Sequence, residues 1–462
     1  MILFVCLEGE VVARLEARGS RVALEYLEPW LSMPGAYPIS QSLPLRPVPF
    51  VGAAVLNYLW GLLPDNARTL DSWGRLFQVS PRNAISLLAH VGEDCAGAVQ
   101  FVREERLETL LDSSRRAPAV QWLDEAELVL RIRHLVADAG AVRESPAEGQ
   151  FSLSGAQAKT AFFYDSSRDR YGIPQGRTPT THILKPVAND FDGFAENEHF
   201  CLELARRVGL PSARTYWRLI GEVPTLIAER YDRVALEGRW VRIHQEDCCQ
   251  ALGIHPVSKY ENEGGPGFRD IMALLESADD PGADRTRLMR TACFIYLIAA
   301  TDSHAKNYSL LMTRGADRPS MRLAPLYDVA SAWPYPRRIP VQKMKFAMRV
   351  GNYYRLRQIQ PRHFDDLARS CRYPPEELRG SLMEMAQNLP DEASALSASL
   401  RGPSAAGETL GILVDAIDRR CQEVLRRLVA APERETRARG TVPETWSPLS
   451  VRVWAAPGLA GK

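Results

Sequence analysis

Asp302 and Asn307 stand five positions apart in the run of residues 300–307, and Asp328 closes the later run of residues 326–328. Phosphoryl transfer from a nucleotide to a hydroxyl group needs a carboxylate that receives the hydroxyl proton, and oxygen ligands that hold Mg²⁺ against the phosphates. Asp302 fits the first role, and Asn307 and Asp328 fit the second. Protein-kinase catalytic loops use the same Asp-x-x-x-x-Asn spacing. The three residues together predict a kinase active site.

Each of these residues taken alone has a plainer explanation. Asp302 is then typical of a helix cap, Asn307 of a turn and Asp328 of a strand end. The occurrence of all three in kinase order is what favours catalysis.

A lysine and a glycine-containing loop upstream could bind the phosphates. Lys185 follows an apolar, β-branched run, as the phosphate-binding strand lysine of kinases does, and Glu198 is a candidate ion-pair partner for it. The loop of residues 152–160 has one glycine, so it matches neither Gly-x-Gly-x-x-Gly nor the Walker pattern. Gly155 still permits close approach of the backbone to an anion, and Lys159 adds charge. A solvated strand-end lysine, a surface glutamate and an ordinary hairpin turn are the alternatives.

Two further groups of residues are expected around a nucleotide. Glu229, Arg230 and Tyr231 follow an apolar strand, where backbone groups between two lobes could bond to adenine. His304 and Lys306 lie between the base and the metal ligand and are expected to face phosphate. A strand exit, a packed histidine and a solvated lysine are the alternatives.

The elements that must position these residues alternate in a kinase-like order. From residue 151 to residue 230, the pattern is strand, loop, strand, lysine strand, helix, strand, and beyond about residue 260 it is mostly helical with a hairpin at residues 309–323. Residues 119–139 read as a helix. We therefore expect an α+β, two-lobed protein-kinase-like fold with an extra small N-terminal α+β subdomain and a mostly helical C-terminal lobe. The expected boundaries are 1–105, 106–260 and 261–433, followed by a charged tail at 434–462 that is expected to be disordered.

Composition excludes several other classes of protein. The chain has 462 residues and a net charge of +1, which gives no general attraction to nucleic acid or to anionic membranes. The apolar run of residues 292–300 is about half the length of a membrane-spanning helix, and the N-terminal apolar run is too short for a signal peptide. The eight cysteines are scattered without zinc-site spacing. Reduced core thiols in a cytoplasmic protein are expected.

The motifs as a set resemble the HipA family of bacterial serine/threonine kinases, the toxins of HipA/HipB toxin-antitoxin pairs. The resemblance covers most of residues 1–430 and rests on residues 152–160, 180–185, 197–202, 228–233, 244–247, 259–261, 264–266, 300–307 and 325–328.

That resemblance implies roles for individual residues. Asp302 would be the catalytic base, Lys185 the phosphate lysine, and Asn307 and Asp328 the Mg²⁺ ligands. ATP would contact Ser154, Gly155, Ala156, Gln157, Ala158, Lys159, Lys185, Glu229, Arg230, Tyr231, His304, Lys306, Asn307, Tyr327 and Asp328.

The resemblance also implies partners. The family's toxins phosphorylate a protein, in the best-known case the aminoacyl-tRNA synthetase for glutamate. A small helix-turn-helix antitoxin, HipB, binds the kinase and represses the operon, so DNA would be reached only through the antitoxin complex. No membrane partner is expected.

A loop serine is expected to be autophosphorylated as an off switch. Ser152 aligns with the serine that family members modify, but Ser154 stands where alanine is frequent. Two hydroxyls two residues apart on a strand face the same side. Either serine is therefore expected to accept phosphate, whose nearly two negative charges are incompatible with ATP phosphates in the same site.

Two other functions fit the same residues. A small-molecule kinase would use the same lobes and metal ligands. A non-catalytic, antitoxin-binding corepressor would keep the fold but would be free to lose Lys185, Asp302, Asn307 or Asp328.

Overall fold

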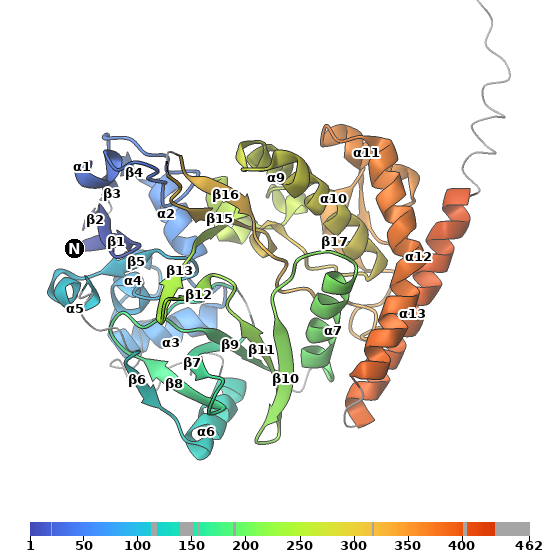
Figure 1. Ribbon diagram of the computed structural model, residues 1–462, viewed down its shortest axis with the longest axis horizontal. Helices are drawn as coiled ribbons and strands as arrows, with labels where there is room; N and C mark the ends of the chain where they lie inside the picture. The colour runs from blue at the N-terminus through green and yellow to red at the C-terminus, as the bar shows by residue number, and fades with distance from the viewer. Residues whose placement is uncertain are drawn as a thin grey trace, which may run out of the picture.

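The computed structural model describes residues 1–19, 21–111, 118–138, 151–155, 157–187, 191–316, 318–400 and 404–429 (Figure 1). Ala156 and the predicted disordered tail at 434–462 lie outside these residues. Within them, helices and strands are both abundant, and the helices gather toward the C-terminus.

The N-terminal part of the chain forms a five-stranded sheet with short helices packed beside it. The strand order is β4-β3-β2-β1-β5, and β3 alternates buried and half-buried residues, as a strand with one face on the core does. The strands are β1 (Ile2–Leu7), β2 (Glu10–Arg18), β3 (Arg21–Tyr26), β4 (Phe50–Val51) and β5 (Gln100–Val102). The helices are α1 (Glu28–Leu31), α2 (Ala53–Gly61), α3 (Ala67–Phe77), α4 (Ala84–Val91) and α5 (Leu107–Leu111).

A six-stranded sheet follows and carries the predicted phosphate lysine. Its order is β10-β11-β9-β7-β8-β6, so the lysine strand β9 lies between β7 and β11. The strands are β6 (Val120–Trp122), β7 (Thr160–Asp165), β8 (Arg170–Pro174), β9 (His182–Pro186), β10 (Thr215–Ile220) and β11 (Val223–Glu229). Helices α6 (Glu125–Ala137) and α7 (Phe194–Arg207) accompany this sheet. The prediction of one helix over residues 119–139 was wrong at its start, because β6 pairs there with β8.

The remaining strands form three small sheets. Strand β14 pairs with β15, and β15 pairs with β16 in the predicted hairpin at residues 309–323. The strands are β12 (Arg233–Leu236), β13 (Arg239–Arg242), β14 (His244–Asp247), β15 (Ser309–Thr313), β16 (Ser320–Leu323), β17 (Lys345–Val350) and β18 (Tyr353–Arg355).

Helices dominate the C-terminal lobe, as expected. They are α8 (Cys248–Ala251), α9 (Phe268–Leu274), α10 (Pro281–Leu297), α11 (Arg362–Ser370), α12 (Pro375–Ser399) and α13 (Ser404–Val429). Figure 1 shows α12 and α13 side by side as the outermost pair, and these two helices pack on each other. A single hydrophobic core runs from the N-terminal sheet into these helices, so the N-terminal subdomain is fused to the C-terminal lobe.

Helix α10 delivers the catalytic loop. Asp280 caps its N-terminus by accepting a hydrogen bond from the backbone of Ala283, and Pro281 occupies the first turn, where its missing N–H costs nothing. Its last turns, from residue 291 to Leu297, are fully buried. Ala299 then adopts a positive φ of 52°, which ends the helix just before Asp302.

A buried ionic network joins the N-terminal subdomain to the segment after β11. Asp94 pairs with Arg233 at 2.9 Å and with Arg242 at 3.2 Å, while Arg230 pairs with Asp232 at 2.8 Å. All the side chains of the network are almost fully removed from solvent. Because breaking a buried ion pair strands a charge, this network fixes the segment that links the two lobes.

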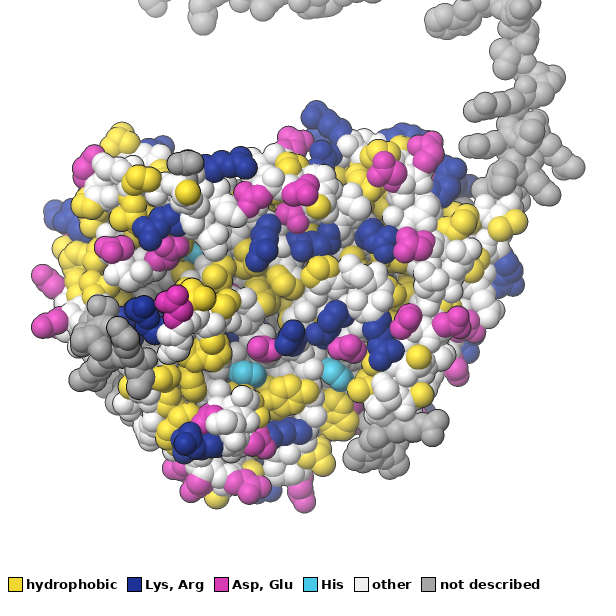
Figure 2. Space-filling model, in the orientation of Figure 1, with side chains coloured by type: hydrophobic (Ala, Val, Ile, Leu, Met, Phe, Trp, Pro, Cys, Tyr) yellow, Lys and Arg dark blue, Asp and Glu magenta, His cyan; other side chains and the backbone are white. Residues whose placement is uncertain are grey.

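The surface carries charges of both signs. Figure 2 shows Lys and Arg interspersed with Asp and Glu over one face, in keeping with the net charge of +1. None of the helices in the described ranges has the length and apolarity needed to cross a bilayer.

Candidate active site

A cavity of about 730 Å³ lies where the two lobes and the N-terminal subdomain meet. The described residues that were predicted for ATP or catalysis line this cavity together, with the loop serine Ser152 as the exception. They are Ser154, Gly155, Gln157, Ala158, Lys159, Lys185, Glu229, Arg230, Tyr231, Asp302, His304, Lys306, Asn307, Tyr327 and Asp328. Side chains far apart in the sequence therefore converge on one space.

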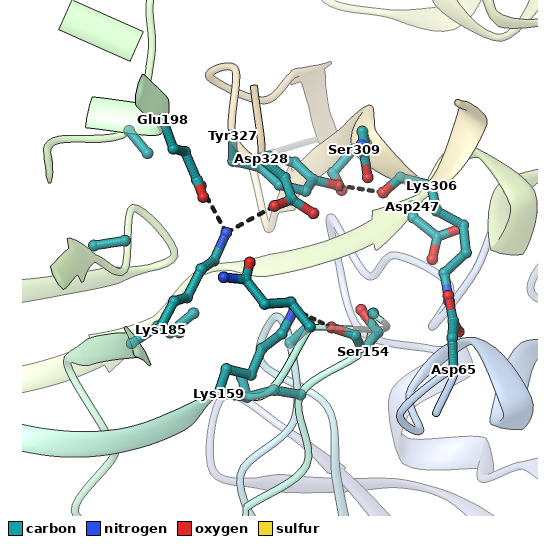
Figure 3. Close-up of a pocket in the computed structure, with 18 of the residues that line it drawn as sticks. Asp65, Ser154, Lys159, Lys185, Glu198, Asp247, Lys306, Ser309, Tyr327 and Asp328 are labelled. Carbon is teal, nitrogen blue, oxygen red and sulfur yellow. Dashed lines mark hydrogen bonds and ion pairs between the residues drawn. The ribbon is translucent and has the colours of Figure 1, made fainter. Parts of the chain in front are cut away.

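Lys185 stands at the centre of an ion-pair chain between the lobes. Its Nζ lies 2.6 Å from Glu198 Oε1 on α7 and 2.8 Å from Asp328 Oδ1 (Figure 3). Lys185 and Glu198 are buried, whereas Asp328 opens onto the cavity. Glu198 was only a candidate partner for Lys185, with a surface glutamate as the alternative, and the structure shows the buried pair.

Opposite charges govern the protonation of this chain. Burial acts to raise the pKa of Asp328, but the ammonium groups of Lys185 and Lys159 outweigh it and hold that pKa well below its usual range. Burial acts to lower the pKa of Lys185, but Asp328 and Glu198 outweigh it and raise that pKa. Lys185 and Asp328 are therefore both charged near neutral pH.

Asn307 and Asp328 are the residues that would hold Mg²⁺, which would supply positive charge beside the phosphates of a nucleotide. The Asn307 Nδ2 donates to the Asp302 backbone oxygen at 2.9 Å, which leaves the amide Oδ1 as the ligand atom. Asp328 has a positive φ of 58°, a costly conformation for a residue with a Cβ and one found at functional sites. Among the described residues no group of three or more His, Cys, Asp or Glu could hold a metal ion alone. Mg²⁺ commonly takes one or two carboxylates with the rest of its shell from phosphates and water, as these two residues would allow.

The side chain of the predicted base Asp302 is exposed at the cavity, and a residue from another segment of the chain contacts it. Tyr260 donates its hydroxyl to Asp302 Oδ1 at 2.8 Å. His304, two residues on, is buried and packs edge-on against the Tyr260 ring. Burial lowers the pKa of His304, so this ring is neutral near pH 7.

The phosphate loop is held inward by the N-terminal subdomain. Ser152 is buried and donates its hydroxyl to the Leu62 carbonyl at 2.7 Å, and Gly155 makes a parallel bridge with Pro64. Gly155 has a φ of 107°, which a side chain would oppose. The prediction that the two serines share one strand face was wrong, because the strand begins only at Thr160 and Ser154 lines the cavity while Ser152 does not.

Lys159 reaches over this loop toward the cavity. Its Nζ donates to the Ser154 carbonyl at 2.8 Å (Figure 3). Burial lowers the pKa of Lys159 to about 8, and the attraction of Asp328 offsets this only partly. A phosphate group near Lys159 would restore its full charge.

The segment after β11 presents backbone to the cavity. The Arg230 side chain points away into the buried ionic network, so only its backbone is available to a nucleotide. The N–H groups of Glu229 and Arg230 already donate to the carbonyls of Arg214 and Thr181. Within the described ranges, the N–H groups of Tyr231 and Asp232 meet no acceptor, and Tyr231 is the first such donor after β11.

The sequence analysis missed Asp65, a charged residue that lines the cavity. Asp65, from the N-terminal subdomain, pairs with Lys306 at 2.6 Å and with Lys259 at 3.0 Å. Burial acts to raise the pKa of Asp65, but the two lysines outweigh it and lower that pKa. No local pattern marks Asp65, since an Asp-Asn pair before a helix is typical of a cap.

The buried carboxyl group of Glu246, a residue that lines the cavity, predicts a pH dependence of stability. Burial raises its pKa to about 8, against hydrogen bonds from Ser40 and Gln41. Because the pKa is higher in the folded state, the protonated carboxyl group contributes to the free energy of unfolding. This contribution is fully present below the unfolded-state pKa near 4.5, and it is lost at about 1.4 kcal/mol per pH unit as the pH rises from there through 8. Thermal unfolding at pH 6 and pH 8 should show a falling Tm in the wild type and a weaker fall in Glu246→Gln. Equal slopes in the two proteins would contradict this. Asp247, whose pKa burial raises to about 6, contributes its own slope mainly below pH 6 and so does not mask the difference.

Comparisons with known proteins identify relatives of this chain. The HipA N-terminal domain model matches residues 3–102, and the HipA-like C-terminal domain model matches residues 151–393. A protein of Sinorhizobium fredii named as a kinase, Y4mE, is 36% identical over 358 residues, which cover 76% of this chain and 81% of that protein. The serine/threonine-protein kinase toxin HipA of Shewanella oneidensis is 27% identical over 335 residues, covering 68% of this chain and 71% of that one.

A solved structure shares the fold. The Shewanella oneidensis MR-1 complex of HipA, HipB and operator DNA contains a chain that matches with a TM-score of 0.78 and 23% identity, covering 93% of this chain and 99% of that chain. The predicted α+β, two-lobed architecture is thereby confirmed. The family models span more than half of the sequence, and together with the 36% identical relative they place this chain in the HipA family of kinases.

Proposed function

We propose that this protein is an ATP-dependent serine/threonine protein kinase that acts as the growth-inhibiting toxin of a toxin-antitoxin pair. The observation that carries the proposal is the convergence of Lys185, Asp302, Asn307 and Asp328 on one cavity. A fold that had lost catalysis would be free to lose some of them.

The four residues have separate roles in the proposed reaction. Lys185 binds the α and β phosphates, while Asn307 and Asp328 hold Mg²⁺, which neutralises charge on the phosphates when bound. The oxygen of the substrate hydroxyl bonds to the γ-phosphorus, its proton passes to Asp302, and ADP leaves. The Tyr231 N–H and the loop of Ser154 to Lys159 hold the two ends of the nucleotide.

The proposed partners follow the family. The substrate is a protein, with an aminoacyl-tRNA synthetase as the first to test, and a HipB-like helix-turn-helix antitoxin binds the kinase. DNA is reached only through that complex, and the protein acts in the cytoplasm. We retain the domain boundaries at 105, 260 and 433 as part of this proposal.

Transfer of label from γ-³²P-ATP to proteins of a cell lysate tests the activity. A labelled protein band is expected with Mg²⁺, and none when EDTA removes the metal, because Asn307 and Asp328 would then face the phosphates without their cation. ATP turnover with label only on a metabolite would instead indicate a small-molecule kinase. Absence of any turnover would indicate a non-catalytic corepressor.

Autophosphorylation of the loop is a separate prediction. After incubation with ATP and Mg²⁺, intact-mass and peptide mass spectrometry should find phosphate at Ser152 or Ser154, and the double variant Ser152→Ala/Ser154→Ala should acquire none there. Ser152 can react only when the loop leaves the Leu62 carbonyl that now accepts its hydroxyl hydrogen. The single variants identify the modified serine, and wild-type protein without phosphate at either position would refute the prediction.

A further inference from the structure

One carboxylate of the N-terminal subdomain lies in the catalytic cavity. Asp65 Oδ1 accepts a hydrogen bond from Lys306 Nζ at 2.6 Å, and Asp65 Oδ2 accepts one from Lys259 Nζ at 3.0 Å. The three side chains are 13%, 3% and 14% exposed, respectively. Figure 3 shows the Lys306 side chain pointing away from the Asp328 cluster and toward Asp65. Asp65 thus binds two lysines that come from separate segments of the C-terminal lobe.

Both lysines are next to groups assigned to the reaction. Lys306 directly precedes Asn307 in the catalytic loop. Lys259 directly precedes Tyr260, whose hydroxyl donates to Asp302 Oδ1 at 2.8 Å. Asp65 is therefore connected to the catalytic loop along two routes, one through Lys306 and one through Lys259.

The backbone of Asp65 meets the phosphate loop as well. Its N–H donates to the Gly155 carbonyl at 3.1 Å, beside the bridge between Pro64 and Gly155. The segment of Leu62 to Asp65 thus holds the phosphate loop through its backbone, and the side chain of Asp65 is left to act on the lysines alone.

We propose that Asp65 is a positioning residue for phosphoryl transfer, which fixes Lys306 directly and Asp302 through Lys259 and Tyr260. The inference rests on the proposed kinase function. It assigns the N-terminal subdomain a part in the chemical step, beyond packing against the two lobes.

Without the Asp65 carboxylate, the side chain of Lys306 would be free to move. Lys306 and Asp247 both line the cavity, and the charge of Lys306 lowers the pKa of Asp247. The Asp247 carboxylate could therefore attract Lys306 if residue 65 carried no charge. A shift of the catalytic loop by about 1 Å costs a reaction on the order of a hundredfold, because the reacting atoms must be aligned. Lys306 was expected to face phosphate, but its Nζ is held by Asp65 Oδ1 at 2.6 Å. Nucleotide binding is therefore expected to depend on Lys185, the phosphate loop and the Tyr231 backbone, none of which contacts the Asp65 carboxylate. The transfer step should therefore be more sensitive to Asp65 than ATP affinity is.

The variant Asp65→Asn separates these effects, because it keeps the shape and the backbone contact with Gly155 but removes the charge. We measure ADP release from MgATP with water as the acceptor, and binding of the non-hydrolysable analogue AMP-PNP by calorimetry. ADP release should fall about 10- to 100-fold, while the AMP-PNP dissociation constant stays within about twofold. Asp71→Asn, an exposed position on helix α3, which begins two residues after Asp65, is the matched control and should change neither quantity.

A second set of variants guards against a trivial loss of folding. Asp65→Glu keeps the charge and should recover part of the rate. Lys259→Gln as a single change should lower the rate, but the double variant Asp65→Asn/Lys259→Gln should be no slower than Asp65→Asn, because Lys259 acts through its contact with Asp65. A rate for Asp65→Asn within about twofold of wild type would overturn the proposal, as would a loss of AMP-PNP affinity equal to the loss of rate. Wild-type protein that releases no ADP would instead overturn the proposed kinase function.

Discussion

Replacing Asp302 with Asn is expected to lower phosphoryl transfer about a thousandfold while ATP affinity stays within about twofold. The amide has nearly the same shape, and its Oδ1 can still accept the Tyr260 hydroxyl, which now lies 2.8 Å from the carboxylate. It cannot take the proton of a substrate hydroxyl, and it no longer carries charge into the transition state. Single-turnover transfer from γ-³²P-ATP measures the rate, and calorimetry with ATP measures the affinity.

Asp391→Asn provides the matched control for this experiment. Asp391 is exposed on α12, and the change there removes a charge of the same sign. Its rate should equal that of wild type. Undiminished labelling by Asp302→Asn, together with undiminished toxicity on expression, would show that another group acts as the base.

Replacing Lys185 with Met should damage both activity and stability. The Nζ of Lys185 lies 2.6 Å from Glu198 Oε1, and the two side chains are 8% and 2% exposed. Removal of one partner leaves a buried charge unpaired, which costs about 3 kcal/mol or more. Loss of the phosphate contact should also weaken MgATP binding at least tenfold, roughly the effect of one charge-assisted hydrogen bond. Urea unfolding and calorimetric titration measure the two losses.

The double variant Lys185→Met/Glu198→Gln separates the two effects. Because a neutral amide in place of the Glu198 carboxylate needs no counter-charge, much of the lost stability should return, whereas nucleotide affinity should stay low. If activity returned together with stability, the role of Lys185 would be to keep the lobe folded, and its assignment to the phosphates would fail.

The sequence was informative where chemistry depends on short spacing. Asp302 and Asn307 lie in one loop, so their spacing predicts their proximity, and hydrophobic periodicity predicted that the C-terminal lobe is mostly helical. The three residues of β6 were too few to show alternation, and that segment was taken for helix.

Contacts between distant segments left no such signal. Asp65 lies 241 positions from Lys306, and nothing near it indicates that partner. Because Arg230 follows a strand, the sequence predicted that its backbone lies at the cavity. It did not predict that the Arg230 guanidinium points into a buried ionic network. For Ser152, the backbone is set by the N-terminal subdomain, through the bridge between Asp94 and Phe151, so strand alternation does not apply.

The buried charge network around Asp94 has a consequence for how nucleotide enters and leaves. The two lobes of a kinase commonly rotate about the connector between them. Here ion pairs of Arg230, Asp232 and Arg233 hold that connector against the N-terminal subdomain. Rotation there would expose several stranded charges at once, a barrier of many kcal/mol. For the proposed kinase function, exchange of nucleotide is then expected to depend less on rotation at this connector than it does in kinases whose connector is free of such ion pairs.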